Sequence, residues 1–184
     1  MKAKILVVDD SREHVELLEA FLATAEYGTV RAFSGLDALS KLESERPDLV
    51  LLDIMMTGMD GYEVCARIKN KADTYPVPVV MITALRDLDE KVRAIDCGAD
   101  DFLTKPVTRL ELISRINSLL RIKHLHDALQ EEKAELARTR ADFENLAISV
   151  KSEVQALLDS KMKNGPEHTK LRREILNILE KLQT

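Results

Sequence analysis

The stretch "PDLVLLDIMMTGMDGYE", residues 47–63, sets a carboxylate at the end of a predicted buried strand. Leu49 to Leu52 form an unbroken apolar run, which is typical of a strand covered on both faces. Asp53 follows at once, and the loop after it contains Gly58 and Gly61. The rest of the chain decides whether Asp53 only ends a strand or takes part in chemistry.

Similar apolar runs alternate with helical patterns through the first two-thirds of the chain. Strands are predicted over residues 4–8, 29–33, 48–52, 77–82 and 100–104. Helices are predicted over residues 13–25, 35–44, 61–70 and 87–98, with a further helix from residue 108. This alternation predicts parallel βαβ units, so we expect an α/β fold with a doubly wound, five-stranded parallel sheet.

Polar side chains follow four of these five strands. They are Asp9 and Asp10, Asp53, Thr83, and Lys105. Sheets of this class place function at the carboxyl ends of their strands, so the set is expected to converge on one rim. Each residue alone has a plainer interpretation, because an Asp after a strand often only caps the next helix. The whole set favours a site.

Such a rim suits phosphoryl chemistry. Crowded carboxylates raise one another's proton affinity, and a hard divalent cation such as Mg²⁺, which prefers oxygen ligands, removes that penalty. The carboxylate of Asp53 can attack phosphorus, while Lys105 and Thr83 would contact phosphoryl oxygens. The histidines are predicted to lie outside the rim and to have no catalytic role; they are His14, His124, His126 and His168.

Composition narrows the class of protein. The chain has 184 residues and a net charge of −5, so broad attraction to nucleic acid or anionic lipid is not expected. Aromatic residues make up 4% and Trp is absent, which weakens the case for stacked bases or an aromatic-lined sugar groove. Cys65 and Cys97 are far apart in sequence and are predicted to be buried or free thiols rather than a disulfide. No apolar run approaches the about 18 residues of a membrane span, and "MKAKILVVDD" is not a signal peptide, so we expect a cytoplasmic protein.

Four motifs resemble the receiver domain of two-component response regulators, the chemotaxis-regulator-like fold with strand order 2-1-3-4-5. They are "LVVDDS", "LVLLDIMMTGMDGYE", "MITAL" and "GADDFLTKP", and the resemblance covers about residues 3–122. It implies that a histidine kinase or phosphotransfer protein phosphorylates Asp53. It also implies a phosphoacceptor rather than an enzyme, with self-catalysed phosphotransfer and slow autodephosphorylation only.

The resemblance further assigns roles by position. It implies Mg²⁺ held by Asp10, Asp53 and the backbone carbonyl of Met55, with Asp9 assisting through water. Lys105 and Thr83 take their usual family roles, and Thr83 and Phe102 match the switch positions. One departure is Thr57, four residues after Asp53, where the family usually has Pro. We expect this Thr to loosen the loop without removing a chemical group.

The last third of the chain predicts a different structure. No Pro or Gly occurs from residue 108 through 164, and an apolar seam runs along this segment at steps of three, four and seven. Its members are Ile122, Leu125, Leu129, Leu136, Phe143, Leu146, Val150, Val154 and Leu157, interrupted by Glu132 and Thr139. The pattern favours a parallel homodimeric coiled coil over residues 123–163 that extends the fifth helix of a receiver domain, residues 1–122.

"NGPEH", residues 164–168, predicts a break, and residues 164–184 are expected to form a turn and a short amphipathic helix. The apolar stripe of this helix is Leu171, Ile175, Ile178 and Leu182. A frayed linker helix is the alternative for the whole tail.

The sequence leaves three other functions to compare. The chain resembles receivers that precede diguanylate cyclase, HD-type phosphodiesterase or phosphatase outputs, so it can be the regulatory half of such an enzyme. A phosphatase with an Asp nucleophile needs a second Asp two residues on, where this chain has Met55. A DNA reader is disfavoured because acidic and basic residues balance from Lys123 onward.

Overall fold

A computed structural model describes residues 3–70, 77–84, 96–161 and 173–175 of the chain. Its described elements alternate between strand and helix from residue 4 to residue 83, and a further strand and a long helix follow in the later described residues. The strands are β1 (Lys4–Val8), β2 (Gly28–Ala32), β3 (Leu49–Asp53), β4 (Val79–Thr83) and β5 (Asp101–Thr104). The helices are α1 (Arg12–Ala23), α2 (Gly35–Glu45), α3 (Gly61–Asn70) and α5 (Arg109–Lys161).

The strands form one parallel sheet in the order β2-β1-β3-β4-β5, as the sequence predicts. β3 lies at the centre, between β1 and β4. All five of its residues are buried, which explains its unbroken apolar run. Parallel pairing brings the carboxyl ends of the strands to one edge, and that edge carries the site.

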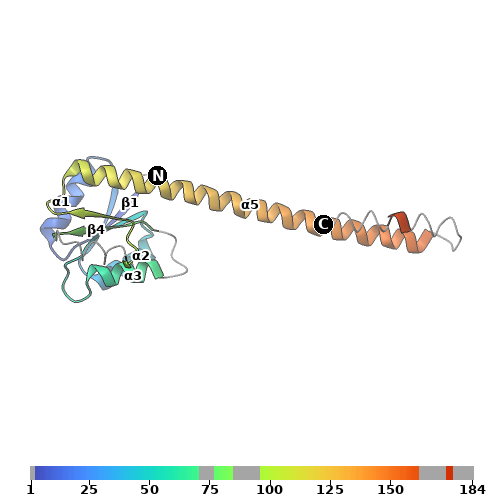
Figure 1. Cartoon of the computed structure of the whole chain (residues 1–184), viewed down its shortest axis with the longest axis horizontal. Helices are drawn as coiled ribbons and strands as arrows, with labels where there is room; N and C mark the ends of the chain where they lie inside the picture. The colour runs from blue at the N-terminus through green and yellow to red at the C-terminus, as the bar shows by residue number, and fades with distance from the viewer. Residues whose placement is uncertain (1–2, 71–76, 85–95, 162–172, 176–184) are drawn as a thin grey trace. The chain divides into compact units, whose positions relative to one another are not determined.

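Alternate residues of the strands face two separate apolar layers, and helices cover both (Figure 1). On one face, Leu6, Val50 and Met81 pack with α2 and α3. On the other, Val7, Leu51 and Ile82 pack with α1 and the first turns of α5. The doubly wound α/β architecture is therefore confirmed.

A serine side chain caps the N-terminus of each of two helices that follow strands. Ser11 accepts a hydrogen bond from the backbone N of His14, and Ser34 does the same for Asp37. These N-caps turn the chain sharply away from the sheet edge, so the residues between strand end and helix stay at the rim.

Element boundaries differ from the sequence predictions by one or two residues at most ends. The difference that bears on the site is at β3, which includes Asp53 rather than ending before it. The helix predicted over 87–98 lies outside the described residues except for its last turn, where Asp96 is helical.

The chain divides into two compact units, Met1–His126 and Asp127–Thr184. α5 is continuous over 53 residues and contributes to both. Of the predicted break and terminal helix, the structure describes only residues 173–175, which are helical. In the described parts of the chain, no helix combines the length and apolarity needed to cross a membrane. The predicted domain boundaries, including the coiled coil over 123–163, remain predictions.

Candidate functional site

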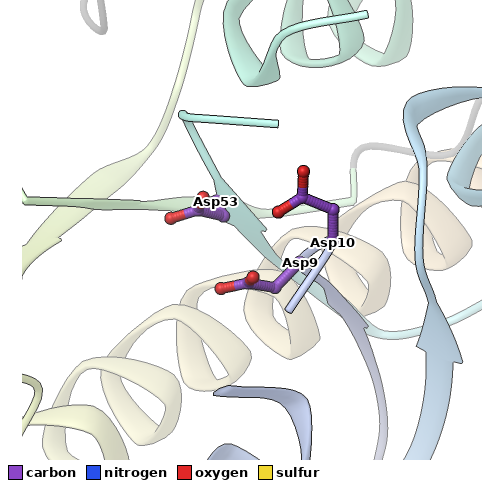
Figure 2. Close-up of side chains that lie close together, drawn as sticks. All are labelled: Asp9, Asp10 and Asp53. Carbon is purple, nitrogen blue, oxygen red and sulfur yellow. The ribbon is translucent and has the colours of Figure 1, made fainter. Parts of the chain in front are cut away.

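Three carboxylates meet where β1 and β3 end (Figure 2). Asp9 and Asp10 follow β1, and Asp53 is the last residue of β3, the strand paired with β1. One oxygen from each lies within 4.8 Å of the others. Asp9 and Asp53 are buried, whereas Asp10 is exposed. The convergence expected from the sequence is therefore present for the acidic residues.

Backbone hydrogen bonds hold the segments after the strands against the sheet. Asp9 N donates to Ala32 O at 3.2 Å, Ile54 N to Ile82 O at 3.1 Å, and Lys105 N to Thr83 O at 2.7 Å. Each bond carries the parallel ladder one residue past its strand. The functional side chains thus leave the backbone at ordered positions, which keeps their separation small.

Asp9 and Asp10 are each oriented by a backbone donor. Asp9 Oδ1 accepts a hydrogen bond from Ser11 N at 2.8 Å, and Asp10 Oδ2 accepts one from Thr57 N at 2.9 Å. The second bond needs an N–H that a Pro at position 57 does not have. Thr57 therefore links its loop to a site carboxylate, and its expected effect on the looseness of the loop stays a prediction.

Lys105 brings the positive charge. Its Nζ lies 2.7 Å from Asp53 Oδ1 and 3.2 Å from Asp9 Oδ2. Burial alone lowers the pKa of Lys105, but the hydrogen bonds and charges of Asp53 and Asp9 outweigh it and hold that pKa above its usual value. The ammonium therefore stays protonated at neutral pH between two acids.

For the Asp53 carboxyl, the effect of burial on the pKa outweighs the effect of its charged partner Lys105. Burial raises its pKa, the hydrogen bond from Lys105 lowers it, and the charge of Asp9 raises it again, so that the net pKa lies above the ordinary Asp value. Lys105 therefore compensates the burial of the Asp53 charge only in part. A second cation at this site would therefore pair with a carboxylate whose charge Lys105 compensates only in part.

His14 corrects an expectation, because it lies at the rim rather than outside it. Its Nδ1 is 3.2 Å from Asp9 Oδ2 and 3.2 Å from Lys105 Nζ. Depending on the tautomer, this nitrogen donates to the carboxylate or accepts from the ammonium. The signal in the sequence was its place in the first turn of the helix that follows β1.

The structure also describes the remaining predicted site residues, which are Thr83, Phe102 and Met55. Thr83 is the buried last residue of β4 and follows Ile82, the residue that pairs with Asp53 across the β3–β4 ladder. Phe102 is half-buried on β5 against the α2–α3 layer. The side chain of Met55 is exposed on the loop after β3. Thr83 and Phe102 are the predicted switch residues, and Met55 is predicted to offer its backbone carbonyl to Mg²⁺.

A cavity of about 400 Å³ adjoins this cluster. Its polar lining is Asp9, His14 and Lys105, and its apolar lining comes from α1, the end of β4 and the segment after Lys105. Of the three acids, Asp9 is the one that lines this cavity. The donor set as a whole, oxygen-rich with one ammonium, fits Mg²⁺ and a phosphoryl group.

Residues 5–117 match the family model of the response regulator receiver domain. The chain belongs to this family. Its relatives include the response regulator PleD of Caulobacter vibrioides, 43% identical over 134 residues, which covers 73% of this chain and 30% of PleD. Receiver domains serve two-component systems as phosphoacceptors and generally bind Mg²⁺ at an acidic pocket, here that of Asp9, Asp10 and Asp53.

Two solved structures show the same fold in other contexts. The receiver domain of a signal transduction histidine kinase from Syntrophus aciditrophicus is 39% identical with a TM-score of 0.61, covering 65% of this chain and 90% of that one. Chemotaxis protein CheY4 of Vibrio cholerae is 27% identical with a TM-score of 0.61, covering 65% and 99%. The chain spans 30% to 57% of the length of the curated relatives that it matches.

Proposed function

We propose that Asp53 is the phosphoacceptor of this receiver domain and takes its phosphoryl group from the phosphohistidine of a two-component kinase or phosphotransfer protein. The observation that carries the proposal is the ion pair of 2.7 Å between Lys105 Nζ and the buried Asp53 carboxylate, at the carboxyl end of the central strand. No general base is needed, because the attacking carboxylate is ionised at neutral pH.

In this reaction an Asp53 oxygen forms a bond to phosphorus as the bond from phosphorus to the donor nitrogen breaks, and the donor imidazole takes up a proton. Lys105 follows the new negative charge and pairs with a phosphoryl oxygen, while the Thr83 hydroxyl donates to another. Asp53 then no longer needs the ammonium as a counter-charge.

Asp10, Asp53 and the Met55 carbonyl would hold Mg²⁺, with Asp9 acting through water. When bound, the ion neutralises charge on the phosphoryl oxygens and on the three acids. The support for this ligand set is the 4.8 Å span of the carboxylate oxygens and the raised pKa of Asp53, which burial causes. Thr57 N leaves the other oxygen of Asp10 available for such a contact.

Phosphorylation adds nearly two negative charges at the rim and gives the switch its driving force. Thr83 moves toward the phosphate, and Phe102 turns into the space that Thr83 leaves. These changes reshape the surface around β5 and the start of α5, and they bias two states a few kcal/mol apart.

Output would pass through a homodimeric coiled coil. Apolar residues at exact seven-residue spacing along α5 support it, and all of them are exposed in the single chain: Ile122, Leu129, Leu136, Phe143, Val150 and Leu157. A second copy of this chain presents the same stripe and can bury it. Glu132 and Thr139, at intervening seam positions, weaken the pairing, which suits a dimer that a signal can tip.

The second candidate is the regulatory part of a larger output enzyme. The observation that favours it is the relation to PleD, of whose length this chain matches only 30%. In that case the coiled coil would hold two output domains side by side rather than bind a separate partner.

Phosphate-affinity gel electrophoresis tests the phosphoacceptor role. The full chain is incubated with a small acyl phosphate donor and Mg²⁺, and a retarded band is expected for the native protein and for Asp96→Asn. Asp53→Asn should give no retarded band. A band of equal intensity in Asp53→Asn would overturn the assignment.

Light scattering with and without beryllium fluoride, which mimics the acyl phosphate, tests the output. We expect the dimer fraction to change on addition of the mimic in the native chain and to stay constant in Asp53→Asn. An unchanged mass in both would remove the link between Asp53 and dimerisation.

A further inference from the structure

Cys65 and Cys97, widely separated in sequence, meet in the fold. Cys65 lies in the middle of α3 and is fully buried, and Cys97 lies in the turn before β5 and is half-buried against the same apolar layer. The Cys65 thiol donates to the carbonyl oxygen of Cys97 at 3.4 Å. Neither cysteine is part of a disulfide.

The two thiols differ in how easily they react. Burial raises the pKa of the Cys65 thiol, and a hydrogen bond and charge interaction with Cys97 raise it further. Cys65 is therefore shielded and slow to react by itself, whereas an oxidant can reach Cys97.

Neighbouring contacts hold α3 and this turn together. Lys69, one turn after Cys65, donates to Val77 O at 3.0 Å and pairs with Asp100. Gly98 has φ +83°, and a Cβ there would lie 3.3 Å from Cγ of Lys69. The backbone segments that carry the cysteines are thus already fixed at contact distance, which lowers the entropy lost on cross-linking.

We propose that Cys65 and Cys97 are a redox modification site, which an oxidant of the hydroperoxide class converts to an intramolecular disulfide and a thiol reductant restores. The Cys97 thiolate first attacks the peroxide, giving a sulfenic acid and releasing the alcohol or water. The Cys65 sulfur then displaces the sulfenic hydroxyl, which leaves as water. Two thiols and one hydroperoxide give one disulfide, one alcohol or water, and one water.

The cross-link would join α3 to the turn that leads into β5. β5 carries Phe102, and Lys105 follows its last residue. Oxidation would therefore restrain the side of the domain that the proposed switch must reshape. The site itself uses no residue of the acidic rim, so the chemistry at the sulfurs is independent of phosphorylation.

Intact-mass spectrometry of the reduced full chain tests the site. The protein is treated at high dilution with hydrogen peroxide, unfolded, and alkylated with N-ethylmaleimide. We expect the mass of two hydrogens to be lost, no alkylation, and a cross-linked peptide pair containing Cys65 and Cys97 that dithiothreitol separates. Two alkylated thiols, an over-oxidised Cys97 beside an alkylated Cys65, or disulfides only between chains would each overturn the proposal.

Three variants make the result specific. Cys97→Ala should keep Cys65 reduced and alkylatable through the same treatment, because burial protects it. Cys65→Ala should carry oxidation at Cys97 to the sulfinic state. Asp53→Asn should form the disulfide at the native rate, so that failure of phosphoryl acceptance and failure of this site are told apart. Oxidation of Cys65 in Cys97→Ala at the rate seen in the native chain would contradict the assigned order.

Discussion

At the scale of single residues, the Asp53 carboxylate is buried, and Lys105 compensates that burial only in part. Burial raises its pKa in the folded chain, so the folded state binds its proton more tightly than the unfolded state does. The contribution of this group to stability is therefore full below the unfolded Asp pKa and is lost as the pH rises through the folded pKa. Above that range the charge on Asp53 destabilises the metal-free protein.

Asp53→Asn should accordingly stabilise the metal-free domain at neutral pH by roughly 1 kcal/mol, the usual size of a single-residue effect. The advantage should shrink as the pH falls through the Asp53 pKa, because the native carboxyl then becomes neutral too. Urea unfolding at several pH values, with a chelator present, measures it. A stabilisation that grows toward acid would show that the Lys105 ion pair, not burial, dominates.

Asp10→Asn should weaken Mg²⁺ binding by about tenfold or more, since even outer-shell partners of metal ligands contribute that much. The reason is the loss of one of three converging carboxylates. Calorimetric titration of the full chain with Mg²⁺ measures the change. Asp96→Asn removes the same charge from an exposed position away from the cluster and should bind like the native chain; equal affinities for all three would exclude Asp10 as a ligand.

The sequence predicted the acids and the lysine of the rim because strand ends in a parallel sheet must share an edge. It did not place His14, whose position depends on how the Ser11 cap turns α1 back over the site. The role of Thr57 also depends on the fold. The folded loop brings its N–H to Asp10, in a bond that Pro cannot make.

At the scale of elements, the contact between α3 and the end of β3 positions the acceptor. Gly61 opens α3, and its N donates to Ile54 O at 3.0 Å. A Cβ at Gly61 would lie 2.3 Å from Asp53 O and 2.8 Å from the Cα of Ile54. The helix can approach the strand this closely only because residue 61 has no side chain.

Gly61→Ala should therefore destabilise the domain by about 1–3 kcal/mol through overpacking and should slow phosphoryl acceptance by displacing Asp53. The matched control is Gly28→Ala, whose Cβ meets only Ala3 O at 3.8 Å. Urea midpoints and phosphate-affinity gels on both variants measure the two effects. If Gly61→Ala and Gly28→Ala had the same urea midpoint and the same rate of phosphoryl acceptance, the close approach of α3 to β3 would not matter for stability or function.

Strand and helix periodicity predicted the order and type of every described element, because apolar runs and 3.6-residue stripes have few other uses in a chain of this size. Periodicity carries no information on which buried side chains touch across elements. Cys65 and Cys97 looked unrelated for this reason. Their contact follows from the packing of α3 against the turn before β5.

At the scale of the whole molecule, we propose that the seven-residue stripe of α5 sets the oligomeric state. Leu136 and Phe143 are 69% and 67% exposed in the single chain, which is unusual for residues so apolar unless a partner covers them. Leu136→Asp should leave the chain monomeric, because it puts a charge into the seam. Ala134→Asp adds the same charge at an exposed position off the stripe and should remain dimeric.

Sedimentation equilibrium on the two variants and the native chain measures this. A native chain that is monomeric at micromolar concentration, or a Leu136→Asp chain that dimerises like Ala134→Asp, would contradict the coiled coil. The phosphoacceptor role would be untouched by either result, because it depends on the rim alone.

The central claim is that Asp53 is the residue that becomes phosphorylated. Borohydride trapping tests it most directly, since it reduces an acyl phosphate to an alcohol and marks the residue for peptide mass spectrometry. After reaction with an acyl phosphate donor and Mg²⁺, the mark is predicted on Asp53 alone. A mark on Asp9, Asp10 or any other carboxylate, or no mark in a protein that remains folded, would contradict the account.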